Sequence, residues 1–348
     1  MSVRRLVGHD WTAVKGVQVP ARVVDTQVAL NDDGDLAVVW LNDGGTSLGG
    51  AVKVGDEPWT SLPAYELEAM GERTLSHAQL RNDGAVVAVT TARPTEDALP
   101  TYEVLTTADG SWEAEELHPN GARASEAIVA SSTLGGLAVA WVEQREREIG
   151  TRGTLVARVR DAGEVSFDDR AELSEKWACG LRDTYCAEVA VIDTGDTVAL
   201  WMNRGGYDGY AFGAVRDAAS DDWSASQRVV PESFVSWHSV HPDGTTVISE
   251  GDDETVYVCH VLEDCAAKPA PEFYAHDRQG SFAYVFAGPN GSAYAVAYKE
   301  SCGDFCIYGK VRAAYLERGK DARAPKAARW TGPQSYASMF VMTCLMRV

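Results

Sequence analysis

Six stretches of the chain repeat one pattern of polar and apolar residues. A short polar turn containing glycine precedes a run of apolar or alternating residues that is typical of a β-strand. Because glycine and asparagine tolerate a positive φ, each stretch predicts a β-hairpin that closes at the turn. The six stretches are NDDGDLAVVW (31–40), NDGAVVAVT (82–90), LGGLAVAW (134–141), DTGDTVALW (193–201), PDGTTVISE (242–250) and PNGSAYAVAY (289–298).

The hairpins recur at a nearly constant spacing. The turn glycines are Gly34, Gly84, Gly135, Gly195, Gly244 and Gly291, with gaps of 50, 51, 60, 49 and 47 residues. A period near fifty residues with strands inside it is typical of β-propellers, in which each repeat buries its faces against its neighbours.

Two further features complete a four-stranded unit, the predicted blade. A third strand follows each hairpin, as in 49–54, 101–107, 154–160, 210–216 and 255–261. An aromatic residue then precedes a fourth, outer strand, and we expect it to fill space between adjacent sheets. These aromatic residues are Trp11, Trp59, Trp112, Phe167, Trp223 and Trp330, with Phe273 or Tyr274 as the substitute in the fifth repeat.

The sequence predicts a single all-β domain over residues 1–348, a β-propeller with seven four-stranded blades. The last blade would be closed by strands from both termini, 1–21 and 333–348, which removes exposed sheet edges. A six-bladed ring with irregular overhangs is the alternative. The six complete repeats would span 22–70, 71–122, 123–182, 183–232, 233–278 and 279–332.

The hairpin rhythm followed by a W-S/T outer strand resembles the degenerate propeller repeats of bacterial sialidase-like and lectin-like proteins. The resemblance covers most of the chain and implies the propeller fold. The Asp-box of sialidases is echoed only by TADGSW (107–112), and no arginine occupies the predicted starts of the first strands, where a sialidase would grip its substrate carboxylate.

Charge and hydropathy exclude several classes of partner. The formal net charge is −20, which opposes nucleic acids and anionic membranes. No apolar run is long enough to span a membrane, so we expect no membrane insertion. Motifs for phosphate loops, dinucleotide binding and serine hydrolases are absent, and we expect no cofactor. We expect a monomer.

Six of the seven cysteines form close pairs in the sequence. These pairs predict the disulfides Cys179–Cys186, Cys259–Cys265 and Cys302–Cys306, with Cys344 left free. Disulfides indicate an extracellular or periplasmic protein. A cytoplasmic location is the alternative, since MSVRRLVGHDW has no signal-peptide core. Free thiols, or a zinc site for which the spacing is poor, are the other interpretations of the cysteines.

Polar residues cluster where the first strand of each repeat should begin, at the mouth of the expected central channel. Counting back thirteen residues from the end of each second strand reaches Gln27, His77, Ile128, Glu188 and Trp237. We call the polar residues at or beside these positions the collar: Asp25, Gln27, His77, Glu126, Glu188 and His238. A hydrated lining of a narrow channel is the structural interpretation of the same residues.

Two functions follow from the collar and the variable loops beside it. In the first, a small polar molecule or glycan binds to Asp25, Gln27, Glu126 and Trp237, with help from the loop residues Asn203, Arg204, Tyr207 and Asp208. In the second, the protein is a hydrolase or lyase that uses His77, Glu188 and His238 as catalytic residues. A protein-interaction scaffold is a third interpretation.

Overall fold

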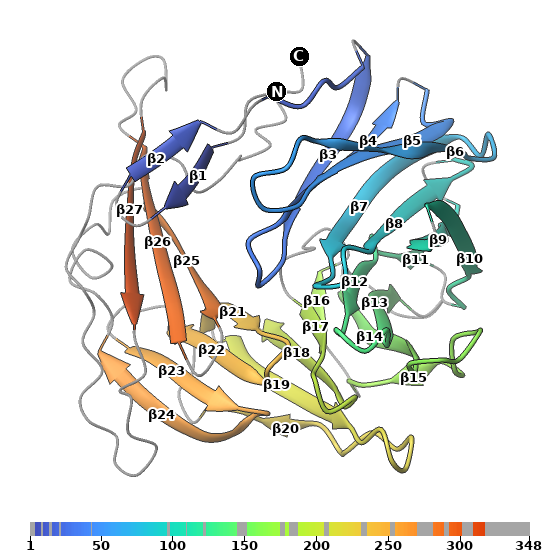
Figure 1. Ribbon diagram of the computed structural model, residues 1–348. Helices are drawn as coiled ribbons and strands as arrows, with labels where there is room; N and C mark the ends of the chain where they lie inside the picture. The colour runs from blue at the N-terminus through green and yellow to red at the C-terminus, as the bar shows by residue number, and fades with distance from the viewer. Residues whose placement is uncertain are drawn as a thin grey trace. The chain divides into compact units, whose positions relative to one another are not determined.

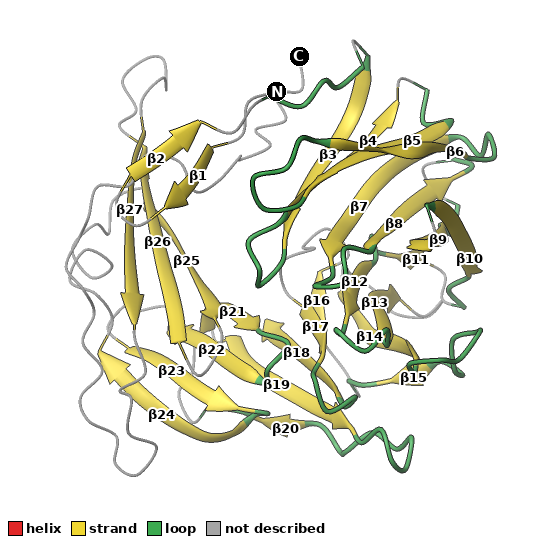
Figure 2. Ribbon diagram, viewed as in Figure 1, coloured by secondary structure: helices red, strands yellow, loops and turns green. Residues whose placement is uncertain are grey.

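The computed structural model consists of β-strands joined by turns and loops, and its described residues contain no helix (Figure 2). Accordingly, no described segment is a helix that could cross a membrane. The described residues are 4–7, 10–13, 16–20, 22–42, 44–95, 98–108, 110–120, 123–144, 152–174, 178–180, 187–204, 209–230, 235–250, 255–269, 281–288, 292–300 and 309–316.

The chain divides into two compact units, which are described separately. The first unit contains the strands of the first three repeats in three successive antiparallel sheets, together with a hairpin near the N-terminus (Figure 1). Its strands are β1 (Arg4–Val7), β2 (Asp10–Ala13), β3 (Val23–Leu30), β4 (Leu36–Asn42), β5 (Ser47–Lys53), β6 (Thr60–Glu66), β7 (Glu72–Leu80), β8 (Val86–Arg93), β9 (Thr101–Ala108), β10 (Ser111–Leu117), β11 (Arg123–Ala124), β12 (Ile128–Ser131), β13 (Leu137–Gln144) and β14 (Arg152–Arg160).

The second unit repeats the same arrangement. Two of its sheets have four strands in chain order, and a third has three strands among the described residues. Its strands are β17 (Ala187–Val191), β18 (Thr197–Arg204), β19 (Gly209–Arg216), β20 (Gln227–Arg228), β21 (Val235–Val240), β22 (Thr245–Glu250), β23 (Thr255–His260), β24 (Glu263–Pro269), β25 (Ser281–Gly288), β26 (Ser292–Glu300) and β27 (Gly309–Leu316). The short strands β15 (Ala171–Glu172) and β16 (Ala178–Gly180) lie in the chain between the two sets.

The predicted hairpin turns are confirmed at five of the six glycines. Each of the five has a φ between 79° and 102°, and its N–H donates to the carbonyl three residues earlier. This is the three-residue hairpin loop, in which the residue before the second strand must adopt a left-handed conformation. The five are Gly34, Gly84, Gly135, Gly195 and Gly244; Gly291 lies outside the described residues.

The core lies between facing sheets. One apolar cluster joins the sheet of β3–β6 to the sheet of β7–β10, and it includes Leu41, Leu75 and Trp112. Another joins the sheet of β7–β10 to β12–β14, and it includes Tyr102 and Trp141, whose ring centroids are 5.1 Å apart. Each sheet therefore buries both faces only when it has neighbours, as the repeat predicts.

The periodic aromatic residues lie where a role in packing requires. Trp112 is 9% exposed, and its Nε1 donates to the Pro63 carbonyl of the preceding sheet at 2.8 Å. Phe167 is buried in the next cluster, and Trp59 packs against a cluster around Val38. The predicted role between sheets is confirmed for Trp112 and Phe167, whereas the contacts of Trp59 are with its own sheet and the segment before it.

The predicted outer strands are only partly correct. β6 and β10 begin beside Trp59 and Trp112, as expected. In the next two repeats the outer strands have two residues each and begin later, at Ala171 and Gln227, whereas Trp223 forms only an isolated bridge to Arg216. An edge strand bonds on one side only, so its length is weakly constrained by its own sequence.

Of the predicted closing blade, only the N-terminal half is described. β1 and β2 form an antiparallel hairpin over the residues predicted to be a third and a fourth strand. Residues 333–348, the other half of the predicted blade, lie outside the described residues. The single-domain organisation and the repeat boundaries therefore stay predictions.

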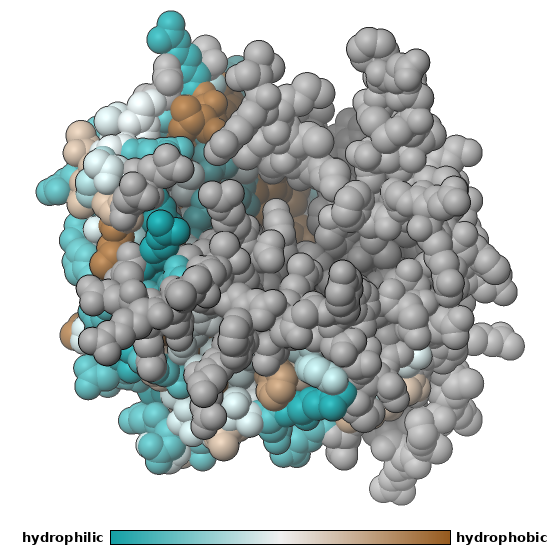
Figure 3. Space-filling model, turned by 180° about the vertical axis from the view of Figure 1, so that it is seen from behind, coloured by the Kyte–Doolittle hydropathy of each residue, from teal (hydrophilic) through white to brown (hydrophobic). Residues whose placement is uncertain are grey.

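The surface agrees with the acidic composition. Where described residues reach the face drawn in Figure 3, hydrophilic colours predominate and the hydrophobic areas are small and separate. The exposed large apolar residues of the described part are spread over several repeats, for example Leu30, Leu99 and Leu134. Single exposed apolar residues are normal for a folded protein.

We predict that Trp112 contributes strongly to the stability of the first unit. Replacing it with alanine should lower the free energy of unfolding by about 3–5 kcal/mol, since a buried aromatic side chain leaves a cavity. Trp112→Phe should cost less, about 1–2 kcal/mol, because the packing is largely kept but the Pro63 carbonyl loses its donor. Urea unfolding of both variants measures the difference, and equal stabilities for the two would contradict it.

Candidate functional site

The strand pairing confirms how the repeats align. Gln27, His77 and Glu188 each lie seven residues before the turn glycine of their repeat. Each pairs with the residue five positions after that glycine, which is Val39, Val89 or Leu200 respectively. Ile128 and Trp237 occupy the same position in their repeats. These residues therefore occupy equivalent positions on the first strands of their repeats.

In the first unit, collar residues of one sheet bond to the backbone of the next. Asp25 Oδ2 accepts a hydrogen bond from Leu75 N at 3.0 Å, while Gln27 Nε2 donates to Leu75 O at 3.3 Å. The backbone N–H of Thr26 also donates to Asp25, at 2.8 Å. One residue of β7 thus has both its N–H and its carbonyl bound by side chains from β3.

Glu126 approaches the same strand from the other side. It lies just before β12, and the hydroxyl of Thr74 donates to its Oε1 at 3.3 Å. Thr74 is the neighbour of Leu75, so carboxylates from the first and third sheets converge on adjacent residues of the second. No described residue forms an ion pair with either carboxylate.

Burial raises the pKa of both carboxyl groups. For Asp25, partial burial outweighs the hydrogen bonds from Leu75 and Thr26 that favour the charged form. For Glu126, burial raises the pKa most and the hydroxyl of Thr74 lowers it; the charge of Asp25 then raises it further, and Arg93 lowers it. The two carboxylates are therefore close enough to repel each other.

His77 occupies the collar position of the second sheet. Its ring hydrogen-bonds to the backbone of Val129 in the third sheet, and burial, which outweighs this bond, lowers the pKa of the imidazole. The ring is therefore neutral near pH 7. Its Nδ1 is buried and has no hydrogen-bond partner among the described residues.

In the second unit, Glu188 repeats the bond between sheets. Its Oε1 accepts from the backbone N–H of Val240 at 3.0 Å and from the hydroxyl of Ser239 at 3.4 Å. Burial raises the pKa of Glu188 from 4.5 to about 8, because these two hydrogen bonds only partly offset the loss of water. A carboxyl group with this pKa is mostly protonated at pH 7.

His238 lies one residue away from the collar position. It pairs with Ile248, whereas Trp237 pairs with Ser249 at the position equivalent to Glu188. Successive residues of a strand face opposite sides, so His238 points away from the face that carries Ser239, which contacts Glu188. His238 is 3% exposed, at a position that Ala78 and Val189 fill in other repeats.

The remaining predicted residues are only partly described. Asn203 and Arg204 belong to β18 and pair with Tyr210 and Gly209; Tyr207 and Asp208 lie outside the described residues. His77 belongs to the first unit, and Glu188 and His238 to the second. The convergence of these three residues on one ligand therefore stays a prediction.

One of the three predicted disulfides is confirmed. Cys259 and Cys265 are bonded, and they join β23 to β24. Cys186, Cys302, Cys306 and Cys344 lie outside the described residues, as does the side chain of Cys179. Among the described residues, no group of three or more histidine, cysteine, aspartate or glutamate side chains is arranged to hold a metal ion.

The sequence did not predict two further residues, Gln79 and Thr74, that form hydrogen bonds between neighbouring sheets as the collar residues do. Gln79 lies two residues after His77 on the same face of β7, and its Oε1 accepts from both the N–H and the hydroxyl of Ser131 in the third sheet. Thr74, which binds Glu126, was also missed. The alternation of strand faces predicts Gln79 once His77 is placed, whereas nothing local predicts the contact of Thr74.

β-Bulges interrupt three of the first strands close to the collar residues. The register shifts between Val23 and Asp25 in β3, between Leu75 and His77 in β7, and between Val235 and Trp237 in β21. A bulge bends its strand and changes the direction of nearby side chains, and bulges are frequent next to functional sites. These shifts recur at the end of the sheets where the collar lies.

Comparisons with known proteins found similarity in structure only. No protein-family model matches the sequence, and no curated protein matches it significantly. Solved structures that resemble the chain include the α-L-arabinofuranosidase Arb93A of Fusarium graminearum (13% identity, TM-score 0.48, covering 86% of this chain and 94% of that one). Virginiamycin B lyase of Staphylococcus aureus has 11% identity and a TM-score of 0.47, with coverages of 88% and 83%.

The lectin of Aleuria aurantia, a fungal six-bladed β-propeller, has 12% identity and a TM-score of 0.46, with coverages of 92% and 100%. Similarities at this level do not establish a shared activity.

The raised pKa of Glu188 predicts a pH-dependent stability. The folded protein keeps the carboxyl protonated up to about pH 8, whereas the unfolded chain loses the proton near the ordinary value of 4.5. The stability that Glu188 contributes is therefore complete below about pH 4.5 and is lost as the pH rises through about 8.

Glu188→Gln removes this ionisation while keeping an oxygen acceptor. Between pH 5 and pH 8, wild type should lose more unfolding free energy than the variant does, as measured by urea unfolding at both pH values. Glu113→Gln, on the exposed surface of β10, is the control and should behave as wild type. Parallel pH profiles for wild type and Glu188→Gln would show that Glu188 ionises normally.

Proposed function

We propose that the protein is a seven-bladed β-propeller that binds a small polar ligand, a glycan above all, at the end of the sheets where the first strands begin. The observation that carries the proposal is the approach of Asp25 and Glu126 to Leu75 and Thr74 from opposite sides. Two sheets thereby direct carboxylates to the end of the sheet between them.

The chemistry of this cluster suits a ligand rich in hydroxyl groups. A half-buried carboxylate that lacks an ion pair retains lone pairs that accept hydrogen bonds from hydroxyl donors. Ser76 and Thr91, whose hydroxyl oxygens are 2.5 Å apart, lie on the strands next to it. Carboxylates and hydroxyls arranged in this way favour a neutral polyhydroxyl compound over an anion.

An enzymatic function is the second candidate. It is favoured by the pKa of Glu188, about 8, which gives a carboxyl group able to donate a proton near neutral pH. In a hydrolase or lyase, Glu188 would act as general acid, and the neutral imidazole of His77 would accept a proton. We leave His238 out of this proposed set, since it faces the other side of β21.

We propose an extracellular or periplasmic location. The Cys259–Cys265 disulfide supports it, because structural disulfides persist in oxidising compartments.

The test of ligand binding uses Glu126→Gln. The substitution removes one charge, and the only hydrogen bond that it alters within the described protein is the one to Thr74. Affinity for a bound oligosaccharide, found by screening a panel of neutral and acidic glycans, should fall at least about tenfold, since a charge-assisted hydrogen bond contributes about 1.5–3 kcal/mol. Isothermal titration calorimetry measures the change.

Glu113→Gln is the matched control, because it makes the same chemical change on an exposed outer strand. Binding unchanged in Glu126→Gln would refute a site at this cluster. Absence of binding to every glycan, together with turnover that depends on Glu188, would favour the enzyme. Absence of both would favour a protein-interaction scaffold.

A further inference from the structure

The hairpin between β23 and β24 has a turn that its sequence does not favour. Val261 and Leu262 have φ values of 46° and 64°, and they are flanked by the pair His260 and Glu263. Two-residue hairpin turns of this kind normally use asparagine, aspartate or glycine, because a left-handed conformation is costly for other residues, above all for a β-branched one. An interaction elsewhere must hold the turn in place.

Leu262 provides one such interaction, since it reaches the neighbouring sheet. Its side chain is 4% exposed and lies against the backbone of Gly213 in β19. A Cβ placed on Gly213 would be 2.4 Å from Leu262 Cδ1, so only glycine leaves room for the leucine. Val229 lies beside the same spot. The turn thus anchors the sheet of β21–β24 to the sheet of β17–β20.

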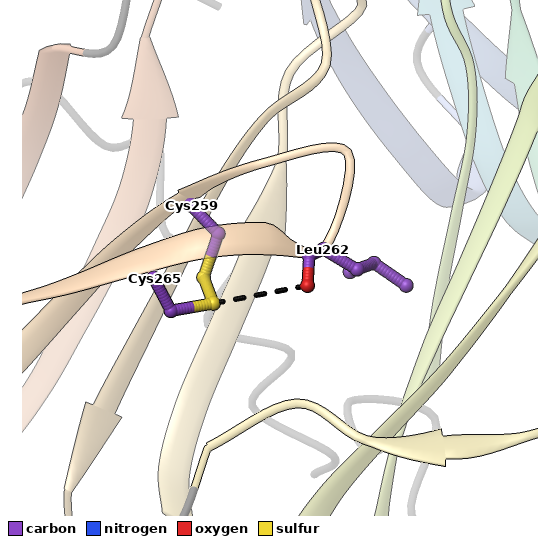
Figure 4. Close-up of a disulfide and its surroundings, with 3 residues drawn as sticks. All are labelled: Cys259, Leu262 and Cys265. Carbon is purple, nitrogen blue, oxygen red and sulfur yellow. Dashed lines mark hydrogen bonds between the residues drawn. A yellow bond between two sulfur atoms is a disulfide. The ribbon is translucent and has the colours of Figure 1, made fainter.

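The disulfide closes this turn at its base. Cys259 is buried near the end of β23, Cys265 is partly exposed in β24, and their Cα atoms are 4.1 Å apart. The strand register shifts between Val258 and His260, so the disulfide replaces regular pairing at this point. Cys265 Sγ lies 3.9 Å from the carbonyl oxygen of Leu262, and a dashed line marks this approach in Figure 4. A disulfide sulfur carries no proton, so this approach is a packing contact within the closed turn.

We propose that the Cys259–Cys265 disulfide is a redox-sensitive latch that holds Leu262 on Gly213 and so couples the two sheets. The reductant is a dithiol. One of its thiolates attacks the sulfur of Cys265, the more exposed of the two residues. The S–S bond breaks, and Cys259 leaves as a thiolate that takes up a proton. The second thiol of the reductant then resolves the mixed disulfide. The products are two cysteine thiols and the oxidised, cyclic dithiol, a transfer of two electrons.

Opening the latch removes the covalent restraint on the turn. Val261 and Leu262 then return to ordinary backbone conformations, and Leu262 leaves β19. The bonds of Glu188 to Ser239 and Val240 lie on the first strands of the same two sheets and do not involve the turn. The sheets therefore stay joined at their first strands and loosen at β19 and β23.

Hydrogen exchange measured by mass spectrometry tests the latch in the intact protein. Adding dithiothreitol to wild type should accelerate amide exchange in β19 at least about tenfold, because local opening becomes easier. The variant Cys259→Ser/Cys265→Ser should exchange β19 at the fast rate without dithiothreitol and should not respond to it. That insensitivity separates this disulfide from the other cysteines of the chain.

Two single substitutions test the anchor without touching the disulfide. Gly213→Ala should displace Leu262 and accelerate exchange in β19 in the oxidised protein, and Leu262→Ala should do the same. Leu134→Ala, an exposed turn leucine in the first unit, is the matched control and should leave β19 unchanged.

Two results would overturn the proposal. In the first, alkylation proves that Cys259 and Cys265 are reduced in wild type, yet exchange in β19 does not change. In the second, dithiothreitol accelerates β19 equally in the double serine variant. Neither result depends on whether the protein binds a glycan.

Discussion

The architecture depends on how the first strand of each sheet satisfies its open edge. A strand at the end of a sheet has backbone N–H and carbonyl groups with no neighbouring strand to bond. Here side chains from the preceding sheet bind them: Asp25 and Gln27 bind Leu75, and Glu188 binds Val240. Because each partner is about fifty residues away, one full repeat, these bonds join successive sheets at their first strands. Apolar clusters join the faces of the sheets.

The binding of carboxylates to the backbone of a neighbouring sheet has an electrostatic consequence. A carboxylate that binds the backbone of the next sheet is removed from water, so the pKa of Asp25 rises, and that of Glu188 reaches about 8. The same residues are therefore both structural links and chemically unusual groups. Perturbed pKa values are found at functional sites but also in structural networks. Glu126 is the more informative residue, because its carboxylate accepts a hydrogen bond from the hydroxyl of Thr74 and, among the described residues, from no backbone group of a neighbouring sheet.

Away from the collar, other contacts join neighbouring sheets. Trp112 and Phe167 fill the space between neighbours, and the tips of the hairpins touch one another, as Asp32 N and Asn82 Oδ1 do at 3.2 Å. At the turn of β23 and β24 the contact between sheets is made by Leu262, in a backbone conformation that a disulfide stabilises. Most repeats are thus joined by hydrogen bonds and apolar packing, whereas the contact of Leu262 with Gly213 depends on the Cys259–Cys265 disulfide.

The sequence by itself determined the repeat and its hairpins. A turn such as that at Gly34 or Gly195 is closed by bonds among neighbouring residues, so its signal is local and survives without the rest of the fold. Counting back from the end of each second strand also placed Gln27, His77 and Glu188 at equivalent positions of their repeats, as the strand pairing shows. Only the tertiary structure decided which of these groups bind one another, for example that Glu126 meets Thr74 and that Glu188 meets Val240. Such contacts join residues from different repeats, and the strand registers and bulges that place them arise only when the sheets pack together.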